Sequence, residues 1–203
     1  MTNLTEPHPL FSGESADVTA LSDQFAEFER QIEQLAQTIG ISLAEFEIDH
    51  LAIRVNSVRQ GQIWLAALLK CGSILSDNQV NGRPIYLIRL DRPLTFAGQA
   101  VSIVELPMPK NKVYPRQGWE HIELVVPFLV KESANEWLNR INQRFGLNEN
   151  PRLRVKVDEP NVEGEQLCNL SIAVTLQEKT ENHSCIKLHP HPIADVVGSE
   201  RQP

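Results

Sequence analysis

The chain contains two copies of one short pattern, and each copy has a histidine in the same position. Residues 48–55 and residues 119–126 both contain an acidic residue, a histidine and then apolar residues at alternate positions. Apolar residues at every second position are typical of a strand that buries one face. The ends of the two copies, residues 102–109 and 185–192, are also alike, and both finish in Pro-x-Pro. The sequence therefore predicts a duplicated unit that begins and ends with a strand.

Each copy also contains a helix and further strands between these ends. The apolar spacing predicts helices over about 57–70 and about 131–145, each with a tryptophan at a matching position. The Asn81-Gly82 pair predicts a tight hairpin, because both central residues of a type I′ turn need positive φ. The remaining strands are expected at 85–90, 100–106, 170–176 and 185–189, with insertions in loops at 148–168 and 177–184 of the second copy.

Residues 17–39 predict an amphipathic helix ahead of the first copy. Apolar residues recur there at alternating steps of three and four, and Gly40 follows as a helix stop. Such a stripe either packs across its own domain or pairs with a second chain in a coiled coil. Because the pattern lasts only about three heptads, packing within the domain is favoured. Residues 1–16 are polar and are expected to form a loose arm.

These elements define an α+β protein. Each copy is a βαβββ module, and the two modules are expected to form one curved mixed sheet around a cup. The N-terminal arm and helix occupy residues 1–46, the first module 47–117, and the second module with a C-terminal tail 118–203. We expect one structural domain, since 203 residues suit a single duplicated domain with a good core.

The composition narrows the class of partner. The chain has 26 acidic and 19 basic residues and a net charge of −7, which does not favour binding to a nucleic acid backbone. No apolar run approaches a membrane span, and the N-terminal residues do not resemble a signal peptide. The three cysteines lack CxxC spacing, which is typical of reduced thiols. We therefore expect a cytoplasmic protein with a small-molecule substrate, and the oligomeric state is left open.

Strand alternation predicts which side chains face the cup. In the first strand, Leu51 and Ile53 face the helix, and His50 faces the opposite, concave side. The same alternation places His121 and Glu105 on the concave side of their own strands. Taken singly, each histidine is more commonly a hydrogen-bonded structural residue than a ligand. Matching positions in two copies, all on one face, favour a shared metal site.

The number of ligands bears on the metal. Three protein ligands leave positions open for substrate, as in non-heme Fe(II) enzymes, whereas four favour Zn, Ni or Mn. The expected cofactor is therefore a divalent metal ion (Zn, Ni, Mn or Fe) whose identity the sequence does not specify.

The last strand, 185–189, offers a fourth ligand in one of two registers. Aligning the two Pro-x-Pro ends places Leu188 in the cup and buries Lys187 and His189 under the helix. Alternation instead buries Leu188 and leaves Lys187 and His189 in the cup. The second register is favoured, because burying a lysine and a histidine without partners is costly. We expect His189 as the fourth ligand and Lys187 as a substrate-binding residue.

Four other polar residues lie next to these positions. Glu123 is on the same face as the second histidine, about 6.5 Å further along the strand, and could act as a catalytic base. Arg54 is about 13 Å from the first histidine and could bind an anionic group of the substrate. Asp49 and Glu120, which precede the histidines, alternate to the other face and are expected to brace neighbouring backbone.

Five segments also carry a resemblance to known proteins: Asp49–Arg54, Asn81–Ile85, Ser102–Pro107, Gly118–Glu123 and Ile186–Pro190. They resemble the bacterial YecM family over about residues 20–200. The paired modules resemble the vicinal oxygen chelate superfamily, which includes glyoxalase I, extradiol dioxygenases and bleomycin-resistance proteins. The YecM resemblance implies the paired fold with an N-terminal helical extension, and no established reaction. The superfamily resemblance implies metal ligands at His50, Glu105 and His121, with a fourth on the last strand.

Three functional interpretations follow. The first is a metal-dependent enzyme whose divalent cation chelates two neighbouring oxygens of a small substrate and stabilises an enolate or oxyanion, as an isomerase, lyase or oxygenase. The second is a non-catalytic protein of the same fold that binds a small molecule or a metal. The third is a structural or interaction protein that keeps the fold with an empty site.

Overall fold

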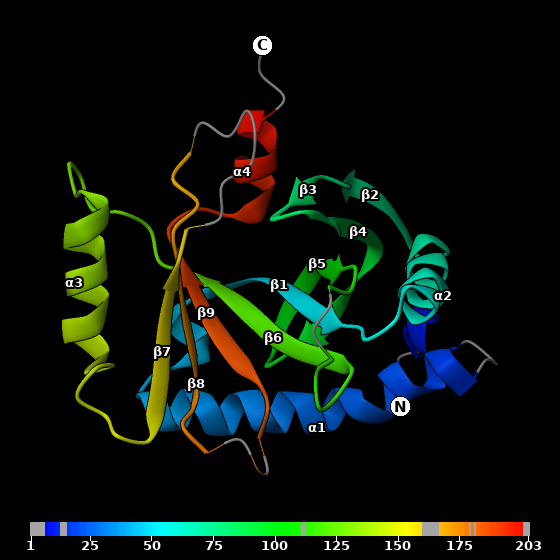
Figure 1. Ribbon diagram of the computed structural model, residues 1–203, viewed down its shortest axis with the longest axis horizontal. Helices are drawn as coiled ribbons and strands as arrows, with labels where there is room; N and C mark the ends of the chain where they lie inside the picture. The colour runs from blue at the N-terminus through cyan, green and yellow to red at the C-terminus, as the bar shows by residue number, and fades with distance from the viewer. Residues whose placement is uncertain are drawn as a thin grey trace, which may run out of the picture.

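The computed structural model describes residues 7–12, 16–110, 113–159, 167–178, 180 and 182–200, and Figure 1 shows their arrangement. The helices and strands are α1 (Ala16–Ile39), β1 (Glu47–Arg54), α2 (Val58–Leu69), β2 (Gly72–Ser76), β3 (Gln79–Val80), β4 (Arg83–Phe96), β5 (Gln99–Pro107), β6 (Gly118–Val125), α3 (Ala134–Phe145), β7 (Leu153–Asp158), β8 (Ser171–Leu176), β9 (Cys185–His189) and α4 (Ile193–Glu200). The fold is α+β, as the sequence predicted.

The strands of the described residues form one open, mixed sheet with β1 and β6 at its centre. The strand order is β2-β4-β5-β1-β6-β9-β8-β7, and β3 pairs with β4 beside this path. In each half the first strand lies parallel to the last one, β1 with β5 and β6 with β9. β1 and β6 run antiparallel to each other, so two βαβββ units meet at the centre of the sheet. The duplicated unit is therefore present, with β3 added to the first copy.

Strand alternation divides core from cup as predicted. The main hydrophobic core contains the apolar residues assigned to the helix side, namely Leu51, Ile53, Val55, Val104, Leu106, Ile122, Leu124, Val126, Ile186 and Leu188. The side chains between them, on the opposite face, include the predicted site residues. Burial of the apolar face therefore fixes the direction of the polar one.

Two β-bulges interrupt the pairing of β1 with β6. The register shifts by one residue at Asp49 in β1 and at Glu120 in β6. A bulge inserts an unpaired residue, so that two consecutive side chains can lie on the same side of a strand. Ile48 and Trp119, which precede the bulges, lie in the core. The expectation that the two acidic residues point away from the histidines is therefore wrong.

The N-terminal helix α1 packs against the same domain. Its stripe is buried in the main core through Leu21, Phe28, Ile32, Leu35 and Ile39. The indole Nε1 of Trp119 donates a hydrogen bond to the Leu21 carbonyl at 2.8 Å, which ties α1 to β6. Figure 1 shows α1 (blue) crossing the lower end of the sheet, with α2 and α3 at opposite sides of the molecule.

The hairpin prediction is confirmed, and three loop predictions need correction. Asn81 and Gly82 have φ of 51° and 77° and connect β3 to β4. The segment predicted as a loop insertion at 148–168 contains strand β7, and the C-terminal tail contains α4. Of the predicted loose arm, residues 1–6 and 13–15 lie outside the described residues, whereas Pro9–Phe11 form a short 3-10 helix with Leu10 buried.

Two further observations bear on the composition-based expectations. Among the described helices, none combines the length and the hydropathy of a bilayer-spanning segment. All three cysteines are free, and Cys71 and Cys185 are buried.

Candidate metal centre

Two histidines and two glutamates converge beneath the cup. The group consists of His50 from β1, Glu105 from β5, and His121 and Glu123 from β6, with one candidate ligand atom of each within 4.8 Å of the others. Glu123 Oε1 lies 3.7 Å from Nε2 of both histidines. Glu105 Oε1 lies 3.7 Å from His121 Nε2, and its Oε2 lies 3.9 Å from His50 Nε2. The predicted convergence of His50, Glu105 and His121 is confirmed.

Strand register brings these four side chains together. His50 in β1 pairs with Glu123 in β6, and the neighbouring Ala52 pairs with His121 on one side and Glu105 on the other. Directly paired residues in adjacent strands have Cβ atoms about 4.5–5.5 Å apart. Ala52 is fully buried between them, and its short side chain leaves room for the longer ones.

Each histidine is held by the acidic residue that precedes it. His50 Nδ1 lies 2.7 Å from Asp49 Oδ2, and His121 Nδ1 makes a very short contact with Glu120 Oε2. A carboxylate at Nδ1 favours the tautomer that leaves the Nε2 lone pair free, which is how metal-binding histidines are commonly oriented. The two bulges therefore create two matching acid–histidine pairs, each aimed at the same point.

Other parts of the fold hold these acids in place. The backbone N–H of Ile193, at the start of α4, donates to both carboxylate oxygens of Asp49 at 3.1 and 3.2 Å. Arg54 donates to Glu120 Oε2 at 2.8 Å and stacks over the ring of Tyr114. Thus Asp49 does brace backbone, as expected, but it braces its histidine as well.

The charges of the group are strongly coupled. Burial disfavours the charged form of His50, but Glu123 and Asp49 outweigh this effect and raise the pKa of His50 to about 9. Burial also disfavours ionised Glu123, yet Lys187 and His50 hold the pKa of Glu123 well below its usual range. The pKa of Glu105 is lowered as well, because Lys187 and the two histidines overcome the opposing effect of burial. Both glutamates are therefore anionic at neutral pH.

The four residues fit a divalent metal ion. Among the described residues, the Nε2 atoms of His50 and His121 are buried and have no hydrogen-bond partner. Such orphaned atoms are rare, because leaving a buried polar atom unpaired costs about 1–3 kcal/mol. Ligand atoms bound to one Zn²⁺ at 2.0–2.2 Å lie roughly 3.3–3.6 Å apart in a tetrahedral site. The four histidine–glutamate separations are 3.7–3.9 Å, and the four candidate ligand atoms all lie within 4.8 Å of one another, so the group could hold a metal after contraction.

Glu123, and not His189, completes this group. His189 lies on the cup side of β9 and Leu188 lies in the core, so the alternation argument is confirmed. However, the two ring nitrogens of His189 pair with the Asn169 side chain at 2.9 Å and the His191 carbonyl at 2.6 Å. Its strand position pairs with Val125, one cup-facing step beyond Glu123. The structure therefore does not bring His189, the expected fourth ligand, into this group.

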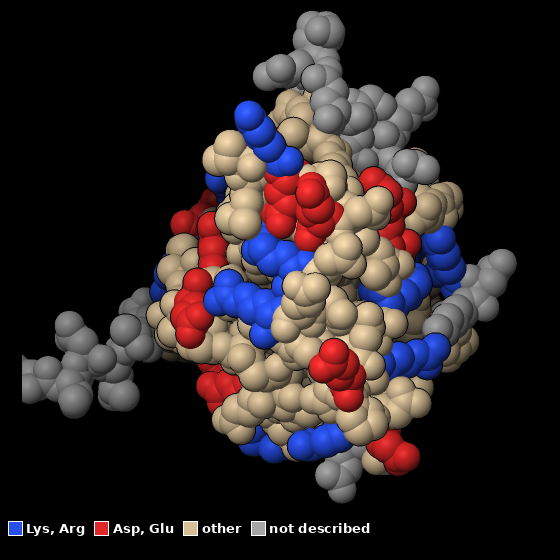
Figure 2. Space-filling view, turned by 90° about the vertical axis from the view of Figure 1, so that its left-hand side faces the viewer, with Lys and Arg blue, Asp and Glu red and all other residues tan. Residues whose placement is uncertain are grey.

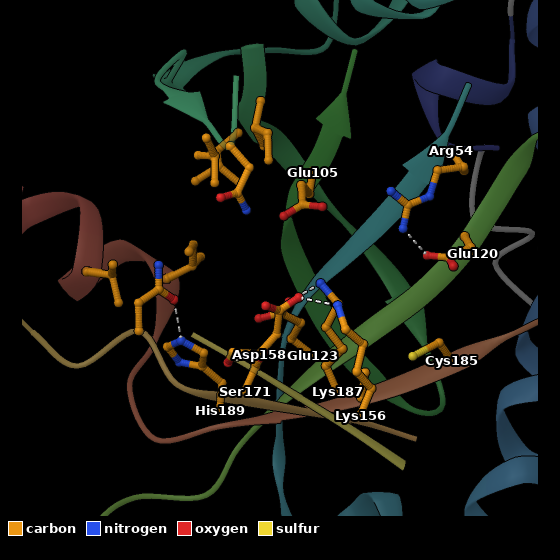
Figure 3. Close-up of a pocket in the computed structure, with 18 of the residues that line it drawn as sticks. Arg54, Glu105, Glu120, Glu123, Lys156, Asp158, Ser171, Cys185, Lys187 and His189 are labelled. Atoms are coloured by element: carbon orange, nitrogen blue, oxygen red, sulfur yellow. Dashed lines mark hydrogen bonds and ion pairs between the residues drawn. The ribbon is translucent and has the colours of Figure 1, made fainter. Parts of the chain in front are cut away.

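Lys187 lies beside the group on the neighbouring strand. It pairs with Glu123 across β9 and β6, and its Nζ donates to Glu123 Oε1 at 2.8 Å. Burial opposes its charge, but Glu123 and Glu105 raise the pKa of Lys187 above its ordinary value. Figure 3 shows Glu105 and Glu123 directed into one space, with Lys187 next to Glu123 and Arg54 paired with Glu120.

The cup above this group is a cavity of about 490 Å³. Residues of both halves of the sheet and of α4 line it, and Arg54, Glu105, Glu123 and Lys187 are among them. Volumes of about 300–1,000 Å³ are typical of small-molecule sites. The sequence interpretation missed Tyr114, Asn169 and the α4 residues of the lining, because no local pattern shows that loops and the chain terminus fold over the cup.

Comparisons with known proteins place the chain in a family. A sequence profile described as YecM protein matches residues 17–200. A protein of Haemophilus influenzae described as uncharacterized is 56% identical over 193 residues, which is 95% of each chain. Protein YecM of Escherichia coli K12 is 34% identical over 181 residues, covering 89% of this chain and 93% of that protein.

A solved structure described as structural genomics protein EC4020 has the same fold. It superposes with a TM-score of 0.75 at 31% identity and covers 92% of this chain and 94% of that one. The profile, the relatives and the solved structure all extend over nearly the whole fold described above. This chain belongs to the YecM family.

Proposed function

We propose that the protein binds one divalent metal ion through His50, Glu105, His121 and Glu123 and presents it to a small substrate in the cup. The observation that carries this proposal is the pair of buried Nε2 atoms without hydrogen-bond partners, which face two anionic carboxylates. A cation at that point would satisfy both nitrogens and neutralise the carboxylates together.

The residues around the group suggest how a substrate would be handled. A bound divalent metal would supply Lewis acidity toward a pair of neighbouring substrate oxygens. The ammonium group of Lys187 has three N–H donors, and one of them bonds to Glu123. Lys187 can therefore also donate a hydrogen bond to a substrate oxyanion. Arg54 reaches the cup while it holds Glu120. We assign Glu123 to metal binding, since its Oε1 faces both histidines, and this replaces its expected role as a base.

The reaction type that this arrangement supports is isomerase, lyase or oxygenase chemistry on a small oxygen-rich molecule. A non-catalytic binding protein would use the same metal and cup without turnover. The two functions differ in a single measurable property, which is whether a bound ligand is recovered unchanged from the metal-loaded protein.

Metal binding itself is tested by titrating metal-free protein with Zn²⁺, Mn²⁺, Ni²⁺ and Fe²⁺ in a calorimeter and in thermal unfolding. We expect one ion per chain and, at a free metal concentration 100-fold above Kd, a stabilisation of about 2.7 kcal/mol. His121→Ala should remove this shift, since its Nε2 faces the metal position. His191→Ala, which changes a nearby histidine outside the group, should retain it. Wild-type unfolding that is indifferent to all four metals would refute the proposal.

Metal affinity should also depend on pH. The pKa of His50 is about 9 in the metal-free protein. At neutral pH both of its ring nitrogens therefore carry a proton, and a metal must displace the one on Nε2. The apparent association constant is therefore expected to rise at least about tenfold per pH unit between about pH 6 and pH 8, because His50 releases a proton on binding. Titrations in buffers of different ionisation enthalpy measure that proton directly. An affinity that stays constant over this range would contradict a role for His50 as a ligand.

A further inference from the structure

We propose that the ligand of the cup is an organic oxyanion with an apolar body. Its carboxylate or phosphate group would lie against cations on β7 and β9, and its apolar part would lie against β4 and α4. This ligand class rests on the small-molecule function proposed above, and it follows from the unequal chemistry of the two walls of the cup.

The wall formed by β9, β8 and β7 carries cations with space between them. Lys187 on β9 and Lys156 on β7 both pair with Ala173 of the intervening strand β8. In the next row, Cys185 and Arg154 both pair with Thr175. Strands two apart in a sheet are about 9–10 Å from each other. The short side chains of β8 therefore leave a trough in which an anion could contact cations on either side.

This wall carries more basic side chains than there are acidic side chains to pair with them. Lys156 pairs with Asp158 at 2.7 Å and Lys187 with Glu123 at 2.8 Å. Arg154 also lines the cup, and it makes no hydrogen bond or ion pair with any described residue. Arg54 lines the same cavity, and its buried Nε has no partner among the described residues. Donors are therefore left over for a ligand.

A metal ion would make this excess of positive charge larger. The acids that line the cup are Glu105, Glu120, Glu123 and Asp158, and the cations are Arg54, Arg83, Arg154, Lys156 and Lys187. The chain as a whole has a net charge of −7. On the outer face shown in Figure 2, basic and acidic side chains are interspersed, without an extended region of one sign. Lys187 lies in the half-buried part of the cup, whereas Arg154 and Lys156 lie at its exposed rim. A cleft lined by an excess of one charge concentrates ligands of the opposite charge.

The apolar side chains of the lining gather on the opposite wall, where Arg83 at the start of β4 is the charged residue. These apolar side chains come from β3, β4 and α4 and are Val80, Ile85, Leu87, Ile193, Val196 and Val197. Leu87 and Val197 form a separate small hydrophobic cluster that packs α4 onto the sheet. Figure 3 shows α4 on one side of the cavity and Lys187, Lys156 and Arg54 on the other. A ligand that filled the cavity would therefore meet charge at one end and hydrocarbon at the other.

Calorimetry with matched ligands tests the ligand class. The probes are hexanoate, hexyl phosphate, hexanol and acetate, each titrated into wild-type protein in the presence of Zn²⁺ and, separately, of EDTA. We expect the two hexyl anions to bind, hexanol not to bind measurably, and acetate to bind much more weakly, by about fourfold for each methylene lost. The stronger of the two hexyl anions identifies the acid group. Equal binding of hexanol and the anions, or no binding of any probe, would overturn the proposal.

A pair of variants locates the anion. The double variant Arg154→Gln/Lys156→Gln should weaken binding of the hexyl anions at least tenfold. The control Arg59→Gln/Lys70→Gln, which changes exposed residues at the two ends of α2, should not. Unchanged affinity in the first variant would overturn the assignment of this wall.

The same titrations separate the failure of this inference from that of the metal proposal. Arg154 and Lys156 are outside the metal group, so the double variant should bind Zn²⁺ normally. Zn²⁺ binding without anion binding would overturn only the ligand class. If the protein binds the anions in EDTA but does not bind Zn²⁺, only the metal-binding proposal is overturned.

Discussion

The variants Asp49→Asn and Glu120→Gln are each expected to weaken metal binding by about ten- to a hundredfold, because carboxylate partners of metal-binding histidines fix the ring and increase its basicity. Each acid contacts a different histidine: Asp49 contacts His50, and Glu120 contacts His121. The double variant should therefore bind metal more weakly than either single variant. Calorimetric titration of the purified variants with the metal that binds wild-type protein most tightly measures them.

A matched control is available on the same strand. Glu47 is an exposed acid of β1 that makes no contact with either histidine, and Glu47→Gln should leave the affinity unchanged. Circular dichroism would confirm that each variant is folded. If Asp49→Asn and Glu120→Gln bind metal as tightly as Glu47→Gln does, the acid–histidine pairs have a structural role only.

Trp137→Ala is expected to lower the free energy of unfolding by about 3–5 kcal/mol, as is typical when a buried tryptophan is truncated. Trp137 is a fully buried residue of α3, and its indole Nε1 donates to the Val126 carbonyl at 2.7 Å. Val126 follows β6, so this contact fixes α3 at the end of a central strand. Urea denaturation followed by circular dichroism measures the loss.

The first copy provides the comparison. Trp64 holds the matching position in α2 and is also buried, so Trp64→Ala should cost a similar amount. Val130→Ala changes a side chain that is 94% exposed and should alter stability by less than about 0.5 kcal/mol. A loss below about 1 kcal/mol for Trp137→Ala would show that α3 contributes little to the fold.

The sequence alone determined the faces of the strands. Alternation assigned His50, Glu105, His121 and Lys187 to the cup, and it placed Leu188 in the core although the repeat alignment suggested otherwise. This assignment succeeded because side chains alternate along any strand, whatever its neighbours are. The spacing of apolar residues also identified α1, α2 and α3, because the periodicity of a helix, like that of a strand, depends only on the local chain.

The tertiary structure decided which cup-facing residues meet. Glu123 replaced His189 in the candidate metal group because the parallel register of β6 and β9 sets His189 opposite Val125. Register across a sheet depends on both strands and their connections, so the sequence of one strand does not specify it. The interpretation from single strands therefore gave the right face, but it did not show that Glu123 lies closer to the two histidines than His189 does.

The acid–histidine pairs show the same division most clearly. Every residue of the Asp49-His50 and Glu120-His121 pairs is visible in the sequence, and their repetition is what drew attention to the site. Their geometry depends on two bulges, which exist only because β1 and β6 pair with each other out of step at those points. Local periodicity thus determined that the histidines face the cup. The pairing of distant strands decided that their acids turn with them, because a bulge is a property of two strands and not of one.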